Sequence, residues 1–302
     1  MIREMRVKRG PKKDRILFDT IAYIFCITFA AACFLPFVMV VAGSFSTEAE
    51  ILKSGYSLLP RGPSLQAYQF IFKSPDIIVG AYGVSLFVTI TGTFLSLITL
   101  SMTAYAISRK QLRTKNAISF YFYFTMLFWG GLLPYYILVS KYLHLRDNLI
   151  VLLIPGMINI FNLMILRSFI ASNINESLIE SVKMDGGGDF VIFFRIVLPL
   201  IKPVLAAIGL FSALSYWNDW FNVMLFIDDR KLFNLQYTVY NIFNKINYLS
   251  SSVNSSMVRN IATPRETIKL AMTVIAIGPI MVAYPFIQKH FATGVTLGAV
   301  KG

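Results

Sequence analysis

The segment IESVKMDGGGDFVIFFRIVLPLIKP, residues 179–203, combines charged side chains with three consecutive glycines in the middle of a strongly apolar chain. Hydrophobic residues make up 56% of its 302 residues and charged residues only 14%, whereas soluble domains carry about 25% charged residues. This composition predicts an integral membrane protein. The charged segment therefore has to be explained as a part of a membrane protein.

Six long stretches carry at most one Asp, Glu, Lys or Arg. A helix of about 20 apolar residues crosses the hydrocarbon core, so each stretch is predicted to span the membrane. The stretches are 20–47, 77–108, 116–140, 148–166, 203–227, which Asp219 interrupts, and 270–288. The first is too long for the apolar core of a signal peptide and has no A-x-A cleavage site, so we expect it to remain uncleaved. The predicted fold is all-α, a polytopic protein with six transmembrane helices.

Basic residues between the apolar stretches set the orientation. The amino-terminal tail has seven and the 109–115 connection has four, whereas the 141–147 connection has two. We therefore expect both termini to be cytoplasmic, with a basic tail at 1–16, a transmembrane domain at 17–290 and a second tail at 291–302. The central loop 171–202 then lies inside the cell. Two other loops, at 48–76 and 228–267, lie outside.

Several other functions are poorly supported. The net charge of +13 is spread over short connections and forms no continuous basic face for nucleic acid. Cys26 and Cys33 are seven residues apart, about 10 Å along a helix, which is too far for a disulfide. With two histidines and no paired Cys/His spacing, a metal site is not expected.

The central segment has signals for two short helices. Asn175 is expected to cap a helix that carries Glu176 and Glu180 in its first turns. The three glycines stop this helix, and a second apolar helix follows until Pro199 and Pro203 break it. An amphipathic loop lying on the bilayer is an alternative. A phosphate-binding loop is excluded because the glycines are not followed by Lys-Ser/Thr.

The spacing of five residues in this segment resembles the signature EAA-x3-G-x9-I-x-LP of the permease subunits of ATP-binding-cassette (ABC) importers. The matching residues are Glu180, Gly186, Ile196, Leu198 and Pro199, with Ser181 and Val182 in place of the two alanines. Asp185 before the glycine is also usual there. YWNDWFN at 216–222 and FATGVTLGAVKG at 291–302 resemble the maltose-type carbohydrate branch, closest to the second permease of oligosaccharide and polysaccharide systems.

This resemblance implies a type I importer fold in a bacterial cytoplasmic membrane. The chain would pair with a sister permease, two ATPase subunits and an extracellular solute-binding protein. It would bind no cofactor and catalyse nothing, because the partner ATPase uses ATP and Mg. Coupling to the ATPase would involve Glu180, Ser181, Val182, Lys183, Met184, Asp185, Gly186, Ile196, Leu198 and Pro199.

Polar groups inside a membrane are costly and therefore candidates for function. Asp219 would lie about 24 Å up the fifth helix, and could line a sugar pathway together with Trp217, Asn218 and Trp220, or these residues could form an aromatic belt. Asn159 and Asn162 could face the pathway or bond across a helix interface.

Two other features concern assembly. Gly80, Gly83, Gly92 and Ser96 form a ladder of small residues that would allow close helix packing against the other spans or against the sister permease. Arg167 is expected to be an interfacial anchor.

Three alternatives remain open at this point. The chain could serve an importer of peptides, amino acids or anions, which the loop signature would fit equally well. It could be a stand-alone secondary carrier, although no internal repeat is evident. A membrane enzyme would need a catalytic constellation that the sequence does not display.

Overall fold

The computed structural model describes residues 12–73, 75–251 and 264–299, and the side chains of 16–73, 75–248 and 264–282. All regular structure in this part of the chain is helical, which confirms the all-α prediction. Most of the predicted tails at 1–16 and 291–302 lies outside the described side chains. The chain divides into two compact units, residues 1–73 with 254–275 and residues 74–253 with 276–302.

The first unit contains α1 (Lys12–Ser44), α2 (Glu48–Ser54), α3 (Gln66–Ile71) and the beginning of α16 (Arg265–Ala299). The Glu48 carboxylate accepts hydrogen bonds from the backbone N–H groups of Glu266 and Thr267, both at 2.9 Å. A negative charge at a helix amino terminus is favourable, so Glu48 fixes the start of α16. The apolar side chains of α1 are mostly exposed, as expected for a surface that faces lipid or another subunit.

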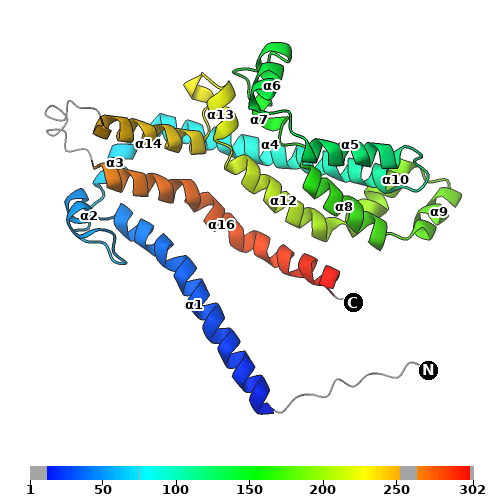
Figure 1. Ribbon diagram of the computed structural model, residues 1–302, viewed down its shortest axis with the longest axis horizontal. Helices are drawn as coiled ribbons and strands as arrows, with labels where there is room; N and C mark the ends of the chain where they lie inside the picture. Colours follow the sequence, from blue (N-terminus) through cyan, green and yellow to red (C-terminus); the bar gives the residue numbers. More distant parts are fainter. Residues whose placement is uncertain (1–11, 74, 252–263, 300–302) are drawn as a thin grey trace. The chain divides into compact units, whose positions relative to one another are not determined.

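The second unit is built around α4 (Pro75–Ser108), which packs against α8 (Ile160–Asn173) and α12 (Lys202–Trp217) (Figure 1). Small residues allow α4 and α12 to approach closely. The Tyr216 ring lies where a side chain on Gly92 would be, 2.6–2.8 Å from an added Cβ, and the Ser96 and Ser212 hydroxyls are 3.5 Å apart. The predicted ladder therefore holds for Gly92 and Ser96.

The other two members of the ladder pack against nothing within the described residues. An added Cβ at Gly80 or Gly83 would have no atom within 4 Å. They therefore do not pack against another described span of this chain, and their packing against the sister permease stays a prediction.

Two helices are long and apolar enough to cross a membrane by themselves, α1 from Ile16 and α4, among the described residues. Two bent pairs raise this number to four if each pair is one span. One pair joins α5 (Lys115–Leu127) to α6 (Leu132–Ile137) and η1 (Leu138–Tyr142), a π-helix, with a bend of 112°. The total of six spans stays a prediction.

Continuous helices over 116–140 and 148–166 were expected, and both expectations are wrong. The first stretch is interrupted at residues 128–131, where Gly131 has φ +94°. The second is interrupted between α7 (Ile150–Leu153) and α8, around Pro155, which cannot donate a backbone hydrogen bond. The fifth stretch, predicted as one helix with Asp219 inside it, is also broken, because α12 ends at Trp217 and α13 (Phe221–Phe226) begins beyond Asp219.

The predicted outer loop at 228–267 contains helices that the apolar pattern did not indicate. These are η3 (Arg230–Leu232), a short 3-10 helix, and α14 (Leu235–Ser251). Asn234 begins α14, since its side-chain oxygen accepts a hydrogen bond from the Tyr237 N–H at 2.9 Å in the manner of a helix cap. The Leu235 N–H donates to the Ser85 hydroxyl at 2.8 Å, which fastens this helix to α4. Residues 252–263 lie outside the described part of the chain.

Candidate functional site

The central segment forms two short helices that meet at a glycine corner, as predicted. The first is α9 (Glu176–Met184) and the second is α10 (Asp189–Ile192). Backbone hydrogen bonds close the corner, from the Gly186 N–H to the Lys183 carbonyl at 3.0 Å and from the Gly187 N–H to the Val182 carbonyl at 2.8 Å. The corner is therefore an ordered turn and not a flexible link.

The three glycines of the corner differ from one another. Gly186 has φ +81°, a backbone conformation that is costly for residues with a side chain. Gly187 is in close contact instead, because an added Cβ would lie 2.6 Å from Val182 Cγ1 and 2.9 Å from the Val182 carbonyl oxygen. Gly188 has φ −74° and open space around it. Only Gly186 confirms the expectation of positive φ.

Two details of the predicted loop are wrong. Asn175 has the extended backbone of a capping residue, but its side chain makes no capping hydrogen bond. Pro199 does not break the second helix, which continues through a π-helix, η2 (Phe193–Val197), into α11 (Leu198–Leu200). The missing N–H of a proline matters least where a π turn already interrupts the regular hydrogen bonds. The chain bends by 80° before α12, near Pro203 in that helix's first turn.

The inner and outer faces of this segment are chemically distinct. Ile179, Ile192, Phe193 and Val197 are buried in a core shared with α4 and α8, and half-buried Val182 and Leu198 pack against the same core. On the outer face, Glu180, Ser181, Lys183, Met184 and Asp185 are exposed. The half-buried Ile196 and the exposed Pro199 complete the set of predicted coupling residues. The outer face is thus free to contact another chain.

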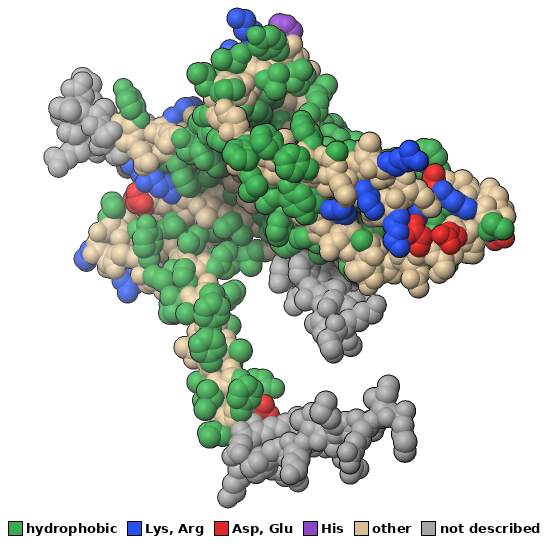
Figure 2. Space-filling model, turned by 45° about the vertical axis from the view of Figure 1, so that its right-hand side comes forward, with side chains coloured by type: hydrophobic (Ala, Val, Ile, Leu, Met, Phe, Trp, Pro, Cys, Tyr) green, Lys and Arg blue, Asp and Glu red, His purple; other side chains and the backbone are tan. Residues whose placement is uncertain are grey.

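The charges on α9 are only partly paired. Lys183 Nζ lies 3.1 Å from Asp189 Oδ1, an ion pair that bridges the corner. Glu180 forms no hydrogen bond or ion pair with another described residue, so it does not cap its own helix. Met184, at the end of this helix, is 88% exposed. In Figure 2, Lys, Arg, Asp and Glu side chains gather near this end of the second unit, whereas hydrophobic side chains dominate much of the remaining surface.

The four predicted pathway residues at 217–220 do not share one surface. Trp217 is buried and its indole N–H donates to the Ala276 carbonyl at 3.3 Å, whereas Asn218 is exposed. The Asp219 carboxylate accepts two hydrogen bonds from Asn222, from its backbone N–H at 3.1 Å and its side-chain N–H at 2.9 Å. Trp220 stacks on Tyr240 with 4.5 Å between ring centroids. In the described structure these residues build the turn between α12 and α13.

Asn159 and Asn162 lie together at a cavity of about 340 Å³. Asn159 also caps α8, because its side-chain oxygen accepts a hydrogen bond from the Asn162 N–H at 3.0 Å. Ser212 and Ser215 of α12 line the same cavity. Neither serine was predicted from the sequence, although their spacing of three residues places them on one helix face. The cavity offers amide and hydroxyl groups that can hydrogen bond to a sugar.

Comparisons with known proteins give concordant results, although no family model matches the chain. The polygalacturonan/rhamnogalacturonan transport system permease protein YtcP of Bacillus subtilis is 44% identical over 95% of this chain and 99% of its own length. Protein LplC of the same organism is 38% identical over 99% of both chains. A crystal structure of a bacterial ABC transporter that imports the acidic polysaccharide alginate includes a chain with a TM-score of 0.79 and 29% identity, matched over 94% of this chain and all of that one.

Proposed function

Because the chain belongs to the permease subunits of carbohydrate ABC importers, we propose that it forms half of a pathway for acidic oligosaccharides and couples it to a separate ATPase through α9. YtcP, the relative with 44% identity, is named as a permease for polygalacturonan and rhamnogalacturonan. The similar crystal structure is that of a transporter involved in the import of alginate. All three are polysaccharides with uronic acid units. Fragments of such polymers are therefore the proposed substrate class.

The corner between α9 and α10 is the observation that carries the coupling role. A helix transmits force only if its attachment is rigid, and here the inner face is buried while backbone hydrogen bonds close the turn. The exposed outer face, from Glu180 to Asp185, presents charges and Met184 without a partner chain. In the proposed complex this face lies in a groove of the ATPase.

Contacts between the connections support their proposed division between the two sides of the membrane, and the count of basic residues indicates which side is cytoplasmic. The 109–115 connection, proposed to be inside, reaches the central loop through the ion pair of Lys110 with Glu176 at 3.2 Å. The 141–147 connection, proposed to be outside, reaches the 228–267 loop through Arg146 and Asp228 at 2.9 Å. Connections on one side of a membrane can meet in this way.

The proposed pathway groups are the polar side chains at the cavity of Asn159 and Asn162, together with the 217–220 turn. Neutral amides and hydroxyls can bond sugar hydroxyls without holding a charged substrate tightly, which suits a passage through which substrate must move on. Both Asp219 oxygens already accept hydrogen bonds from Asn222. We propose that Asp219 shapes the pathway by holding this turn.

The proposed partners are a sister permease, two ATPase subunits that use ATP and Mg, and an extracellular solute-binding protein. Capture of the chain from detergent-solubilised native membranes, followed by mass spectrometry, tests this assembly. We expect all three kinds of partner with the wild-type chain, and loss of the ATPase alone with Glu180→Lys. Glu50→Lys in α2, the same charge reversal in the proposed outer loop, should retain the ATPase. Absence of an ATPase from the wild-type capture would contradict the proposal.

Uptake measurements test the substrate class separately. Cells that lack this chain should lose uptake of labelled oligogalacturonides while uptake of an unrelated sugar such as glucose stays normal. Restoration by the wild-type chain provides the control for expression. Unchanged oligogalacturonide uptake in the deletion strain would contradict the acidic saccharide assignment and leave the family assignment intact.

A further inference from the structure

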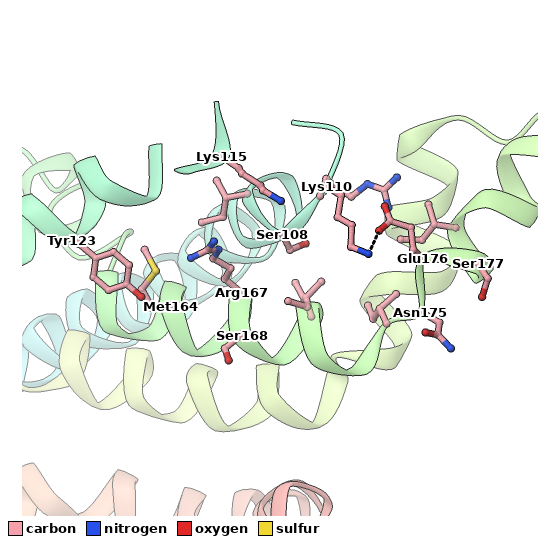
Figure 3. Close-up of a pocket in the computed structure, with 16 residues that line it drawn as sticks. Ser108, Lys110, Lys115, Tyr123, Met164, Arg167, Ser168, Asn175, Glu176 and Ser177 are labelled. Carbon is pink, nitrogen blue, oxygen red and sulfur yellow. Dashed lines mark ion pairs between the residues drawn. The ribbon is translucent and has the colours of Figure 1, made fainter. Parts of the chain in front are cut away.

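A pocket of about 660 Å³ lies beside α9 in the second unit and takes no part in the roles described above (Figure 3). Its walls come from the carboxyl-terminal end of α4 and the connection after it, from α5, from the carboxyl-terminal half of α8 and from the beginning of α9. Tyr123 and Met164 line one end beside Arg167, and Lys110 and Glu176 lie at the other end. All of these elements belong to one compact unit.

Positive charge dominates the pocket. Four cationic side chains line it, Arg109, Lys110, Lys115 and Arg167, against the single carboxylate of Glu176. Lys110 pairs with Glu176 at 3.2 Å, and Arg109 lies 4.0 Å from the same carboxylate. A concave surface lined by one sign of charge concentrates the field and attracts ions of the opposite sign.

The two remaining cations lack partners. Neither Lys115 nor Arg167 forms a side-chain hydrogen bond or ion pair with a described residue, although both are half-buried. Figure 3 shows Lys115 reaching from α5 and Arg167 from α8 into the space between these helices. Partly buried cations without counter-ions are costly, and Arg presents a fork of N–H donors that matches phosphate oxygens.

We propose that this pocket binds a phosphate ester, with Arg167 and Lys115 as its main ligands and Lys110 at the rim. A phospholipid headgroup and a soluble phosphate compound share this chemistry. The surroundings favour the lipid, because the outer surface of α5 exposes Phe120, Phe124 and Leu127 and basic pockets between helices at the cytoplasmic side of a membrane suit anionic headgroups. Tyr123 and Met164 then lie where the glycerol and the first acyl carbons would be.

Occupancy of the pocket would also reach the coupling helix, a consequence that rests on the proposed function. Glu176 is the first residue of α9 and competes with a bound phosphate for Lys110. Side-chain exposure of 78% leaves Lys110 free to turn toward a ligand, whereas Arg109 is only 10% exposed and is also held by Gln111 at 2.6 Å. A bound phosphate therefore loosens the attachment of α9 at its amino terminus.

Native mass spectrometry of the purified full chain tests the binding. The probes are dioleoylphosphatidylglycerol, which is anionic, and dioleoylphosphatidylcholine, which is not. We expect selective retention of phosphatidylglycerol by the wild type. Because each cation near a membrane surface contributes about a fivefold change in affinity, Arg167→Gln and Lys115→Gln should each weaken retention about fivefold and the double variant roughly 25-fold. Arg167→Lys should retain most binding, and Lys141→Gln, at an exposed lysine outside the pocket, should retain all of it.

Competition separates the two sources of phosphate. If excess inorganic phosphate or glycerol 3-phosphate leaves phosphatidylglycerol bound, the ligand is the lipid. If these compounds displace it and bind with the same dependence on Arg167 and Lys115, the ligand is a soluble phosphate ester. Equal retention of both lipids, or undiminished retention by a folded, monodisperse double variant, would overturn the proposal. The proposal would also be overturned if the double variant lost the ATPase in the capture experiment but bound as many phosphatidylglycerol molecules as the wild type. Because lipid is counted on the isolated chain, this result is independent of the partner capture.

Discussion

Replacing the three corner glycines one at a time should give three different results. Alanine at Gly186 must adopt φ +81°, which costs about 1–2 kcal/mol for a residue with a side chain. Since 1.4 kcal/mol is a factor of ten in an equilibrium constant, the closed corner becomes about five- to thirtyfold less favourable relative to open conformations. Gly186→Ala should therefore weaken coupling while leaving the helices on both sides intact.

Alanine at Gly187 should be more harmful. Its Cβ would lie 2.9 Å from the Val182 carbonyl oxygen, the group to which the Gly187 N–H donates at 2.8 Å. Removing this clash requires a backbone shift that breaks the hydrogen bond, at a net cost of about 1 kcal/mol. Overpacking of the new Cβ against Val182 Cγ1 costs about 1–3 kcal/mol more. Gly188→Ala is the matched control, because φ −74° and open space impose no cost, and fewer unfolded conformations stabilise it by about 0.4–1 kcal/mol.

The assay is substrate-stimulated ATP hydrolysis by the reconstituted complex, normalised to the amount of permease in the membrane. We expect wild-type activity for Gly188→Ala, a clear reduction for Gly186→Ala and the largest loss for Gly187→Ala. ATPase capture should fall in the same order. Equal losses for Gly187→Ala and Gly188→Ala would refute the geometric reasoning, and so would normal activity in Gly187→Ala.

Two further perturbations test the second unit. Tyr216→Phe removes the hydrogen bond from the Tyr216 hydroxyl to the Leu153 carbonyl at 2.8 Å. The midpoint of thermal unfolding should therefore fall by a few degrees, as expected for a loss of about 1 kcal/mol. An unchanged midpoint would contradict a stabilising role for this hydrogen bond. The Asp147 pKa lies below its usual value because the backbone N–H groups of Asp229 and Asp228 donate to its carboxylate. The ionised carboxylate therefore stabilises the folded protein. This contribution is complete above the unfolded pKa near 4 and is lost as the pH falls through the lower folded pKa. In Asp147→Asn, the unfolding temperature should fall less steeply with decreasing pH than in the wild type. Identical plots of unfolding temperature against pH for the two proteins would contradict this prediction.

The central corner could be predicted from the sequence because its signals are local. Three consecutive glycines disfavour continuation of a helix, and the apolar periodicity on either side of Gly186 indicates two short helices. The breaks inside the third and fourth apolar stretches also have local signals, the pairs Gly130-Gly131 and Pro155-Gly156. Such pairs mark turns, but an apolar count over a long window does not register them. Composition therefore predicted membrane-inserted segments and overestimated their continuity.

Contacts distant in the sequence could not be predicted. Lys110 meets Glu176 only because α4 and α8 pack side by side, and no local pattern encodes that pairing. For the same reason the cavity at Asn162 gained Ser212 and Ser215 from α12. The turn at 217–220 shows the opposite error. Trp217 and Asp219 were judged by residue type, whereas their neighbours determine that Trp217 is buried and that Asp219 accepts hydrogen bonds from Asn222.

The proposed coupling role imposes a mechanical requirement that explains the mixture of charges and glycines in residues 179–203. The outer face of α9 has to be polar enough to remain exposed before a partner binds, while the chain behind it has to be packed firmly enough to move as a body. Ile192, Val197 and Ile201 are completely buried between the corner and α12, so this connection cannot absorb a displacement as a loose linker would. Packed interiors transmit strain. A displacement of α9 would therefore be transmitted past the 80° bend into α12. The far end of α12 holds Tyr216 against Gly92 of α4. In this way the charged, glycine-containing segment joins the exposed face of α9 to the core.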